Sequence, residues 1–401
     1  MQTSHTKSAV KERKKESNRL LALDILRGIT IAGMIMVNNP GSWGNIYAPL
    51  RHAEWNGFTP TDLVFPFFMF IMGISTYFSL RKYDFKFSWK SFLKLLRRTV
   101  VIFFIGLAIA WFGRFLNGMV SGKSFAESVN TFSQMRILGV MPRLALCYGI
   151  GASLALLLPY KRLPWLVAAI LVVYTIILLL GNGYEFSETN ILYIIDNKIL
   201  GPNHLYTDTV NGVSLKLDPE GLLSTLPAIA HMLIGFICGG LITKTKDNNL
   251  RINSLFIVGT ILTFSGLLLQ YGLPINKKIW SPTFVLTTCG LASSFLGLLI
   301  WIIDIKGHKK WCRFFESFGI NPLFMYCLGA ILSIVMGAIK VPYSAMESGM
   351  ISLKGWIYKG VLMPACGDDA TLASLAFAIL FVLFNWCIGY ILYKKKIYIK
   401  I

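Results

Sequence analysis

A cluster of polar side chains follows the first apolar stretch of the chain and contains the residue types that catalysis requires. His52 stands in this cluster with Asn38, Asn39, Glu54 and Asp62. An imidazole titrates near neutral pH, so it suits a general base or an acyl-accepting nucleophile. The two asparagine amides could donate hydrogen bonds to a developing oxyanion, and either carboxylate could orient the imidazole. Because a single loop histidine is more often structural than catalytic, the residues alone leave both interpretations open.

Two opposite charges lie inside the first apolar stretch itself. Asp24 and Arg27 are three residues apart, which places both on one face of a helix, where each neutralises the other. Charges inside a membrane are unfavourable, so this pair must face protein or a water-filled cavity. It is either a structural ion pair, or Arg27 offers its charge to a phosphorylated ligand.

Other polar residues could contact a substrate on the same side as His52. Trp55 suits the membrane interface or stacking on a sugar ring, and Asn56 follows it directly. Arg143 lies about two turns inside an apolar stretch and is either a counter-ion for Asp62 or a pocket residue.

Two later motifs are also rich in polar groups. Asp218 and Glu220 in DPEG precede an apolar stretch and could bind a cationic or hydroxyl-rich substrate, or cap a helix in water. Asn321 and Pro322 in GINPLFMY should break another apolar stretch, which a membrane helix tolerates only against protein or a cavity.

The composition indicates that the elements holding these residues lie in a membrane. Of the 401 residues, 55% are hydrophobic and only 14% are charged, with a mean hydropathy of +0.60. The net charge of +20 could suggest nucleic acid, but no basic module or zinc spacing accompanies it, so we expect no nucleic-acid partner. The seven cysteines show no CxxC spacing, so we expect neither disulfides nor a metal site.

Apolar runs of the length needed to cross a bilayer recur along the chain and predict an all-α, polytopic transmembrane bundle of about ten spans. The expected spans are 20–37, 61–80, 98–116, 137–158, 164–181, 221–242, 253–271, 283–304, 315–338 and 370–393. If 345–366 also crosses, there are eleven.

The distribution of basic residues orients this bundle. Lysine and arginine are more than twice as numerous on the side of the amino terminus as on the other side, which predicts that both termini are cytoplasmic. Residues 1–19 then form a basic cytoplasmic tail, and 20–401 form a single transmembrane domain. His52 would lie outside, and Asp24 and Arg27 would lie near the cytoplasmic end of the first span.

Several segments together resemble the heparan-α-glucosaminide N-acetyltransferase family. They are LDILRGITIAGMIMVNN, RHAEWNGFTPTDLVFPFFMFIMG, RILGVMPRLALCY, DPEGLLSTLPAI, LPINKKIWSPTFVLTTCG and GINPLFMY. The most specific part is His-Ala-x-Trp-Asn-Gly, which Asp-Leu-Val-Phe-Pro follows. The resemblance extends from about Arg19 to the last apolar stretch.

The resemblance implies an acetyl-CoA-dependent acyltransferase that uses cytoplasmic acetyl-CoA to acetylate the amine of a glucosamine-type sugar across a bacterial inner membrane. The family's active-site histidine falls on His52 and its asparagine on Asn38. Asp62, Glu54 and Asn39 would support them. The CoA phosphates would lie near Arg27, and the other candidates for that end of the ligand are Arg97, Arg98, Arg313 and Asn321. The acceptor would lie near Trp55, Asn56, Arg143, Asp218 and Glu220.

Two other functions fit the same residues. A sugar or lipid transporter would also have many spans and intramembrane charges, but it would have no requirement for acetyl-CoA. A polysaccharide O-acetyltransferase would use the same donor on a hydroxyl. The natural acceptor, an acetyl-histidine intermediate and a homodimer are left open by the sequence.

Overall fold

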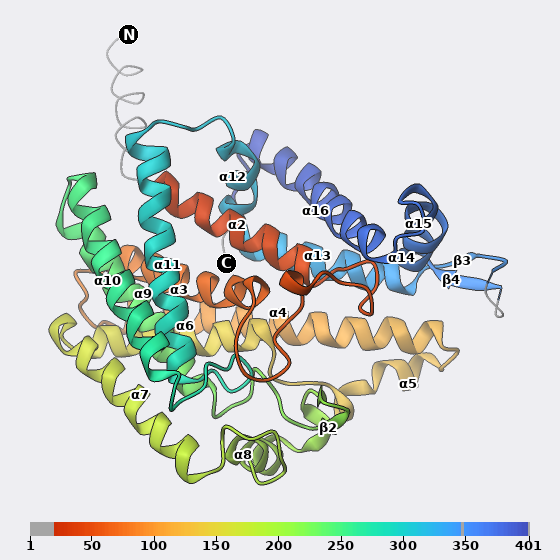
Figure 1. Cartoon of the computed structure of the whole chain (residues 1–401), viewed down its shortest axis with the longest axis horizontal. Helices are drawn as coiled ribbons and strands as arrows, with labels where there is room; N and C mark the ends of the chain where they lie inside the picture. The colour runs from red at the N-terminus through yellow and green to blue at the C-terminus, as the bar shows by residue number, and fades with distance from the viewer. Residues whose placement is uncertain (1–19, 346–348, 400–401) are drawn as a thin grey trace.

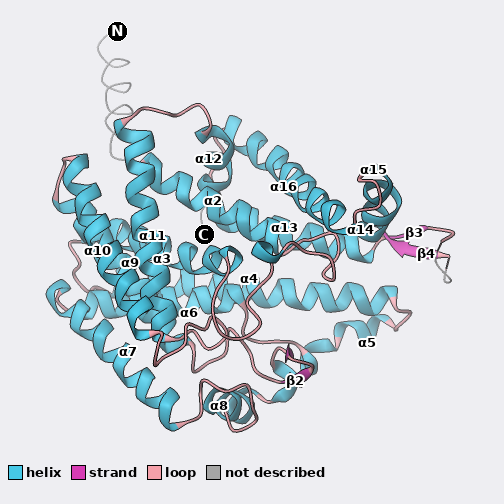
Figure 2. Cartoon of the chain, in the orientation of Figure 1, coloured by secondary structure: helices cyan, strands magenta, loops and turns pink. Residues whose placement is uncertain are grey.

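The computed structural model describes residues 20–345 and 349–399, and most of these residues are helical (Figures 1 and 2). The expected basic tail, 1–19, lies outside the described residues. Each of the ten expected spans contains at least one helix. These helices are α2 (Leu21–Val37), α3 (Pro60–Leu80), α4 (Trp89–Val120), α6 (Val140–Leu157), α7 (Leu163–Leu180), α9 (Thr225–Lys244), α10 (Asn248–Leu269), α11 (Pro282–Ile300), α12 (Cys312–Ile320), α13 (Pro322–Ala338) and α16 (Ala370–Lys394).

The remaining elements are short and lie between these helices. They are α5 (Phe125–Val129), α8 (Ile191–Leu200), α14 (Leu353–Trp356), α15 (Met363–Ala365), five 3-10 turns (Ala48–Leu50, Arg81–Tyr83, Thr131–Gln134, Tyr160–Arg162, Pro202–His204), two π-helical turns (Trp301–Ile305, Ile357–Leu362) and the antiparallel hairpins β1 (Asp208–Val210) with β2 (Val213–Leu215) and β3 (Lys340–Pro342) with β4 (Met350–Ser352).

The helices support a multi-pass membrane protein. Among the described residues, eight helices are long and apolar enough to cross a bilayer, and a ninth span forms if α12 and α13 count as one despite their bend of 88°. Helix α2, with 17 residues, is shorter than any of the eight. The count of ten spans and the cytoplasmic placement of both termini stay predictions. Of the segment 345–366, residues 349–366 form no helix long enough to cross.

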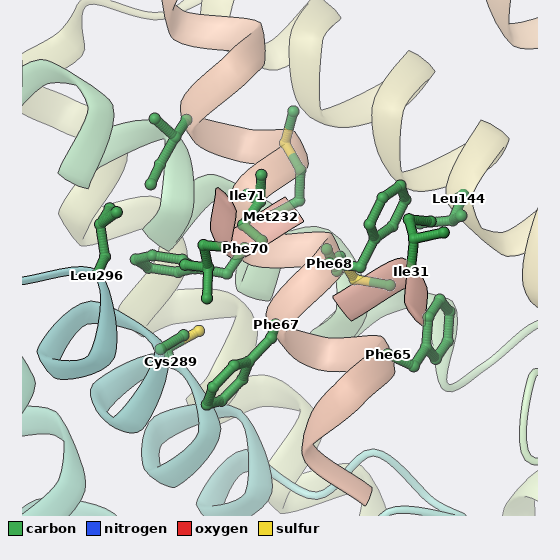
Figure 3. Close-up of a cluster of buried hydrophobic side chains, with 14 of the residues drawn as sticks. Ile31, Phe65, Phe67, Phe68, Phe70, Ile71, Leu144, Met232, Cys289 and Leu296 are labelled. Atoms are coloured by element: carbon green, nitrogen blue, oxygen red, sulfur yellow. The ribbon is translucent and has the colours of Figure 1, made fainter. Parts of the chain in front are cut away.

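The best-enclosed helices surround α3, where side chains from α2, α6, α9 and α11 meet (Figure 3). The aromatic and aliphatic side chains of α3 pack there against Ile31, Leu144, Met232 and Leu296. In α9, 83% of the residues in the apolar stretch are buried, against 6% in α4. The outer helices thus expose apolar side chains, as a bundle in lipid does.

Small residues allow the central helices to approach closely. Gly73 of α3 lies against the backbone of α9, and Gly235 of α9 lies against the backbone at Phe70 of α3. A side chain at either position would overlap main-chain atoms, so these glycines permit the crossing of α3 and α9. This contact fixes α3, whose first turn carries part of the candidate site.

Three loops meet beyond one end of this central group. The loop after α2 joins the segment before α11 through a bridge between Gly57 and Asn276, in which Gly57 N donates to Ile275 O at 2.6 Å. It joins the loop before α8 through Trp55 Nε1, which donates to Tyr184 O at 2.7 Å. These loops lie in the lower half of Figure 1, away from the start of α2.

Candidate active site

His52, Asp62 and Lys277 form a compact cluster of titratable groups where the loops meet. His52 Nδ1 lies 2.6 Å from Asp62 Oδ1, and Lys277 Nζ lies 2.9 Å from the same nitrogen and 3.1 Å from the same oxygen. The His52 side chain is 39% exposed, whereas that of Asp62 is fully buried. The geometry is that of an imidazole oriented by a carboxylate, with its other face open to a ligand.

Local sequence explains why Asp62 is fixed in place. Pro60 begins α3 and Asp62 is its third residue, so the carboxylate can accept the backbone N–H of Thr59 at 3.0 Å, as in a capping box. The oxygen that accepts Thr59 N is Oδ2, and it also accepts Ala53 N at 3.0 Å. The other oxygen, Oδ1, faces His52. One carboxylate therefore caps the helix, ties down the His52 loop and holds the imidazole.

Lys277 was not singled out from the sequence. It lies 225 residues from His52 along the chain, within the segment LPINKKIWSP. That segment belongs to the motifs that resemble the acetyltransferase family, which is the signal that could have identified it. The sequence offered Arg143 as a counter-ion for Asp62, but the cation beside Asp62 is Lys277.

The two asparagines after α2 differ in their surroundings. Asn39 is buried, and its Nδ2 donates to Ile35 O at 2.7 Å, so its amide serves the end of the helix. Asn38 is exposed, and among the described residues its side chain makes no hydrogen bond. Glu54 is exposed as well, and within the described part of the chain no hydrogen bond or ion pair joins it to His52. Asn38 therefore keeps an amide available for a ligand.

Trp55 and Asn56 serve the junction between loops. The Trp55 ring packs edge-on against Phe186 with centroids 5.1 Å apart, and its indole N–H is bonded to Tyr184 O. Asn56 Oδ1 accepts Asn276 Nδ2 at 3.3 Å. Both residues lie next to the candidate site, and in this structure their polar groups hold the loops together.

Asp218 and Glu220 share one cation. Arg136 Nε donates to Asp218 Oδ2 at 2.8 Å, and Arg136 Nη2 contacts both carboxylates. Although burial disfavours the charged form of Glu220, the neighbouring guanidiniums of Arg136 and Arg143 hold its pKa below its ordinary value. The DPEG segment thus forms an ionised cluster with Arg136. The sequence alone did not predict this pairing.

Arg143 is fully buried beneath these loops. Its Nη2 donates to Gly221 O at 2.8 Å and contacts Ser224 Oγ, and its guanidinium lies 5.2 Å from the centre of the Trp280 ring. Arg143 therefore fastens the start of α9 to the segment that carries Lys277.

The Asp24–Arg27 pair lies on α2 among three helices. Arg27 Nη1 is 2.9 Å from Asp24 Oδ1 and donates to Gly319 O at 3.2 Å, and Nη2 donates to Ser75 Oγ at 2.8 Å. Gly28 lies directly against the backbone of α12 at Phe315, which explains why no larger residue fits there. The guanidinium connects α2, α3 and α12.

The other residues assigned to the CoA end have varied surroundings. Arg97 and Arg313 are exposed, and Arg98 lies 4.7 Å from the centre of the Tyr148 ring. Asn321 is buried at the bend between α12 and α13, where its Nδ2 donates to Ile397 O at 2.9 Å and its Oδ1 accepts Ile399 N at 2.8 Å. The Asn321 amide holds the end of the chain.

Within 20–345 and 349–399, no group of three or more His, Cys, Asp or Glu side chains is arranged to hold a metal ion. All seven cysteines there are free thiols.

Comparisons with known proteins relate the chain to one family. Residues 19–274 match the family described as heparan-alpha-glucosaminide N-acetyltransferase, catalytic. The chain is similar to heparan-alpha-glucosaminide N-acetyltransferase of Mus musculus, at 27% identity over 440 residues, covering 97% of this chain and 61% of that protein. It is similar to the protein of the same name from Homo sapiens, at 28% identity over 369 residues, covering 77% and 52%. The chain thus spans between half and two thirds of the length of these curated relatives.

Proposed function

Because the chain belongs to the heparan-α-glucosaminide N-acetyltransferase family, we propose that it moves an acetyl group from cytoplasmic acetyl-CoA to the amine of a glucosamine-type sugar on the other side of the membrane. We propose a bacterial inner membrane as its location. The observation that carries the proposal is the contact of 2.6 Å between His52 Nδ1 and Asp62 Oδ1, with the imidazole 39% exposed.

In the proposed reaction, His52 acts as a general base through Nε2. The amine nitrogen of the sugar attacks the thioester carbon, and Nε2 takes the proton that the amine loses. Asp62 accepts a hydrogen bond from Nδ1–H throughout, and its negative charge stabilises the imidazolium that forms. When the C–S bond breaks, the imidazolium returns its proton to the sulfur, so the products are an acetamide and free CoA.

Asn38 is the proposed oxyanion donor. Its side-chain amide is exposed and makes no hydrogen bond among the described residues, so it can donate to the oxygen that becomes negative as the amine attacks. Such a donor stabilises the transition state more than the ground state, which lowers the barrier. Asn39, with its amide bonded to Ile35 O, supports the position of this turn.

The donor would enter from the opposite end of the bundle. From Arg27 to Asn38 the α2 axis rises by about 17 Å, which an extended pantetheine arm can largely span. Arg97, Arg98 and Arg313 are the proposed partners of the CoA phosphates, because they lie outside the tightly packed ion pair of α2. The acetyl group then crosses most of the membrane while the nucleotide stays on the cytoplasmic side.

The test is an acetyl-transfer assay with purified protein, labelled acetyl-CoA and a panel of acceptors that includes glucosamine, its oligomers and muropeptide fragments. The His52→Ala variant should show no measurable transfer while it is still produced and still binds acetyl-CoA. His204→Ala is the matched control, since His204 is another loop histidine, whose Nδ1 lies 2.7 Å from Met135 O.

The outcomes separate the proposed function from its alternatives. Near-normal transfer by His52→Ala removes His52 from the reaction. Transport of an amino sugar without any need for acetyl-CoA identifies a transporter. Acetylation of hydroxyl groups with amines left unmodified identifies an O-acetyltransferase.

A further inference from the structure

The ammonium group of Lys277 occupies an unusual position for a lysine near a catalytic histidine. It lies 2.9 Å from His52 Nδ1 and 3.1 Å from Asp62 Oδ1, and its side chain is only 14% exposed. Lys277 lies three residues after the end of the matched family region, 19–274, in the segment LPINKKIWSP.

The protons at this contact can be assigned from the distances. A contact of 2.6 Å between Nδ1 and a buried carboxylate requires the proton to lie on Nδ1, because two lone pairs would repel each other there. An ammonium cannot donate to a nitrogen that already carries a proton. Lys277 therefore donates to Asp62 Oδ1, which accepts from both the ring and the lysine.

This assignment has an electrostatic consequence for the imidazole. A buried carboxylate alone favours the positively charged ring, which could no longer accept a proton from an amine. A second positive charge at about 3 Å opposes that effect. With Lys277 in place, the lysine, the aspartate and a neutral ring sum to zero charge.

The turn that carries Lys277 is rigidly built. The buried Asn276 side chain accepts Lys278 N at 2.8 Å, its own backbone N–H donates to Ser281 Oγ at 2.9 Å, and Trp280 N donates to Lys277 O at 3.0 Å. Trp280 is fully buried and has φ of +51°, a left-handed conformation that bulky residues rarely adopt. Such strain persists where the surrounding packing determines the shape of the turn.

We propose that Lys277 is a positioning residue that keeps the His52 ring neutral, with Nδ1–H donating to Asp62, so that Nε2 can accept a proton from the acceptor amine. This role rests on the proposed function. The charged groups that face the ring are Asp62 from α3 and Lys277 from the segment before α11. Lys277 also interacts electrostatically with Glu220, from the segment before α9. Loss of Lys277 leaves the imidazole beside an uncompensated carboxylate.

The experiment measures acetyl transfer against pH for Lys277→Met, Lys277→Arg and Lys278→Met. Lys278 is the matched control, because it lies in the same turn but pairs with Asp208 at 2.7 Å. In Lys277→Met, the acidic limb of the kcat profile should move up by about one pH unit, so that kcat is roughly tenfold lower at pH values on that limb and recovers at higher pH. Lys277→Arg should retain the normal profile, and Lys278→Met should match the parent protein.

A second readout is independent of catalysis. Diethylpyrocarbonate reacts with the neutral form of an imidazole and not with its protonated form. The labelling of the His52 peptide against pH, measured by mass spectrometry, therefore reports the protonation of His52 directly. The labelling midpoint should rise by about one pH unit in Lys277→Met. If labelling shifts but the parent protein transfers no acetyl group, the role of Lys277 stands and the proposed function fails. An unshifted midpoint, or an equal loss of activity at every pH, overturns the role proposed for Lys277.

Discussion

The two ends of α2 use charge in different ways. At one end, Arg27 is held by Asp24 of the same helix and by Ser75 and Gly319 of two neighbouring helices. At the other end, His52 meets Asp62 and Lys277 from two loops and one helix terminus, and 39% of its side chain stays exposed. The first set of contacts joins three helices and the second leaves one ring nitrogen for a ligand. A charged residue in a membrane bundle is therefore structural when all its hydrogen bonds go to other helices. It is a candidate for binding or catalysis when a donor or acceptor atom is left for a ligand.

The sharpest way to break this comparison is at Asp62. Asp62→Asn should lower kcat by about 100- to 10,000-fold with little change in KM, because an amide cannot hold the Nδ1 proton as a carboxylate does. Thr59→Ala is the control, since it removes one bond to the other carboxylate oxygen and leaves the His52 contact in place. Steady-state kinetics on purified protein measure both variants. Equal losses in the two would mean that Asp62 matters only for capping α3.

At the opposite end, Arg27→Ala should reduce stability more than activity. Removing the arginine leaves Asp24, which is 7% exposed, without this partner, and such losses amount to about 3 kcal/mol. Thermal unfolding in detergent should show the decrease, and the double variant Asp24→Asn with Arg27→Met should recover part of it. The KM for acetyl-CoA should stay unchanged. A raised KM with normal unfolding would instead make Arg27 a ligand-binding residue.

The smallest expected effect concerns Asp196, a buried carboxylate on α8 that binds the backbone of the segment before α9. Burial raises its pKa to about 6, although Leu223 N and Leu222 N donate to it. The folded protein therefore takes up a proton at Asp196 between about pH 4 and pH 6, where the unfolded chain does not. Stability is lost as pH rises through this window.

Asp196→Asn removes that loss, because asparagine stays neutral and can keep both backbone bonds. Its unfolding temperature should equal that of the parent protein near pH 4 and exceed it near pH 7.5, by an amount equivalent to about 2–3 kcal/mol. Thermal unfolding at a series of pH values measures this difference. A constant difference across the series would show that Asp196 does not titrate in this window.

The sequence predicted most of the helices because bilayer-length apolar runs leave few alternatives. It also named Asp62 as one of two carboxylates that could orient His52, since Asp62 lies at the start of the helix that follows the His52 loop. Lys277 could not be placed, because 225 residues separate it from His52 and nothing local in a lysine marks its partner. The same limit applies to Asn321, whose amide meets Ile397 and Ile399 from the end of the chain. The local sequence pattern thus located the His52 loop, and only the tertiary structure shows which distant residues contact it.

The bridge between Gly57 and Asn276 has a consequence for biosynthesis. A membrane protein is made and inserted from its amino terminus, so α2 and α3 are in place long before the segment that carries Asn276 and Lys277 leaves the ribosome. The His52 loop must wait through the synthesis of five further long helices, α4, α6, α7, α9 and α10, before it can close onto that turn. Closing a loop of this length follows insertion instead of guiding it. The chain is thus inserted first and acquires its candidate active site later, so a defect in the turn before α11 would yield a membrane-embedded protein with an unfinished site.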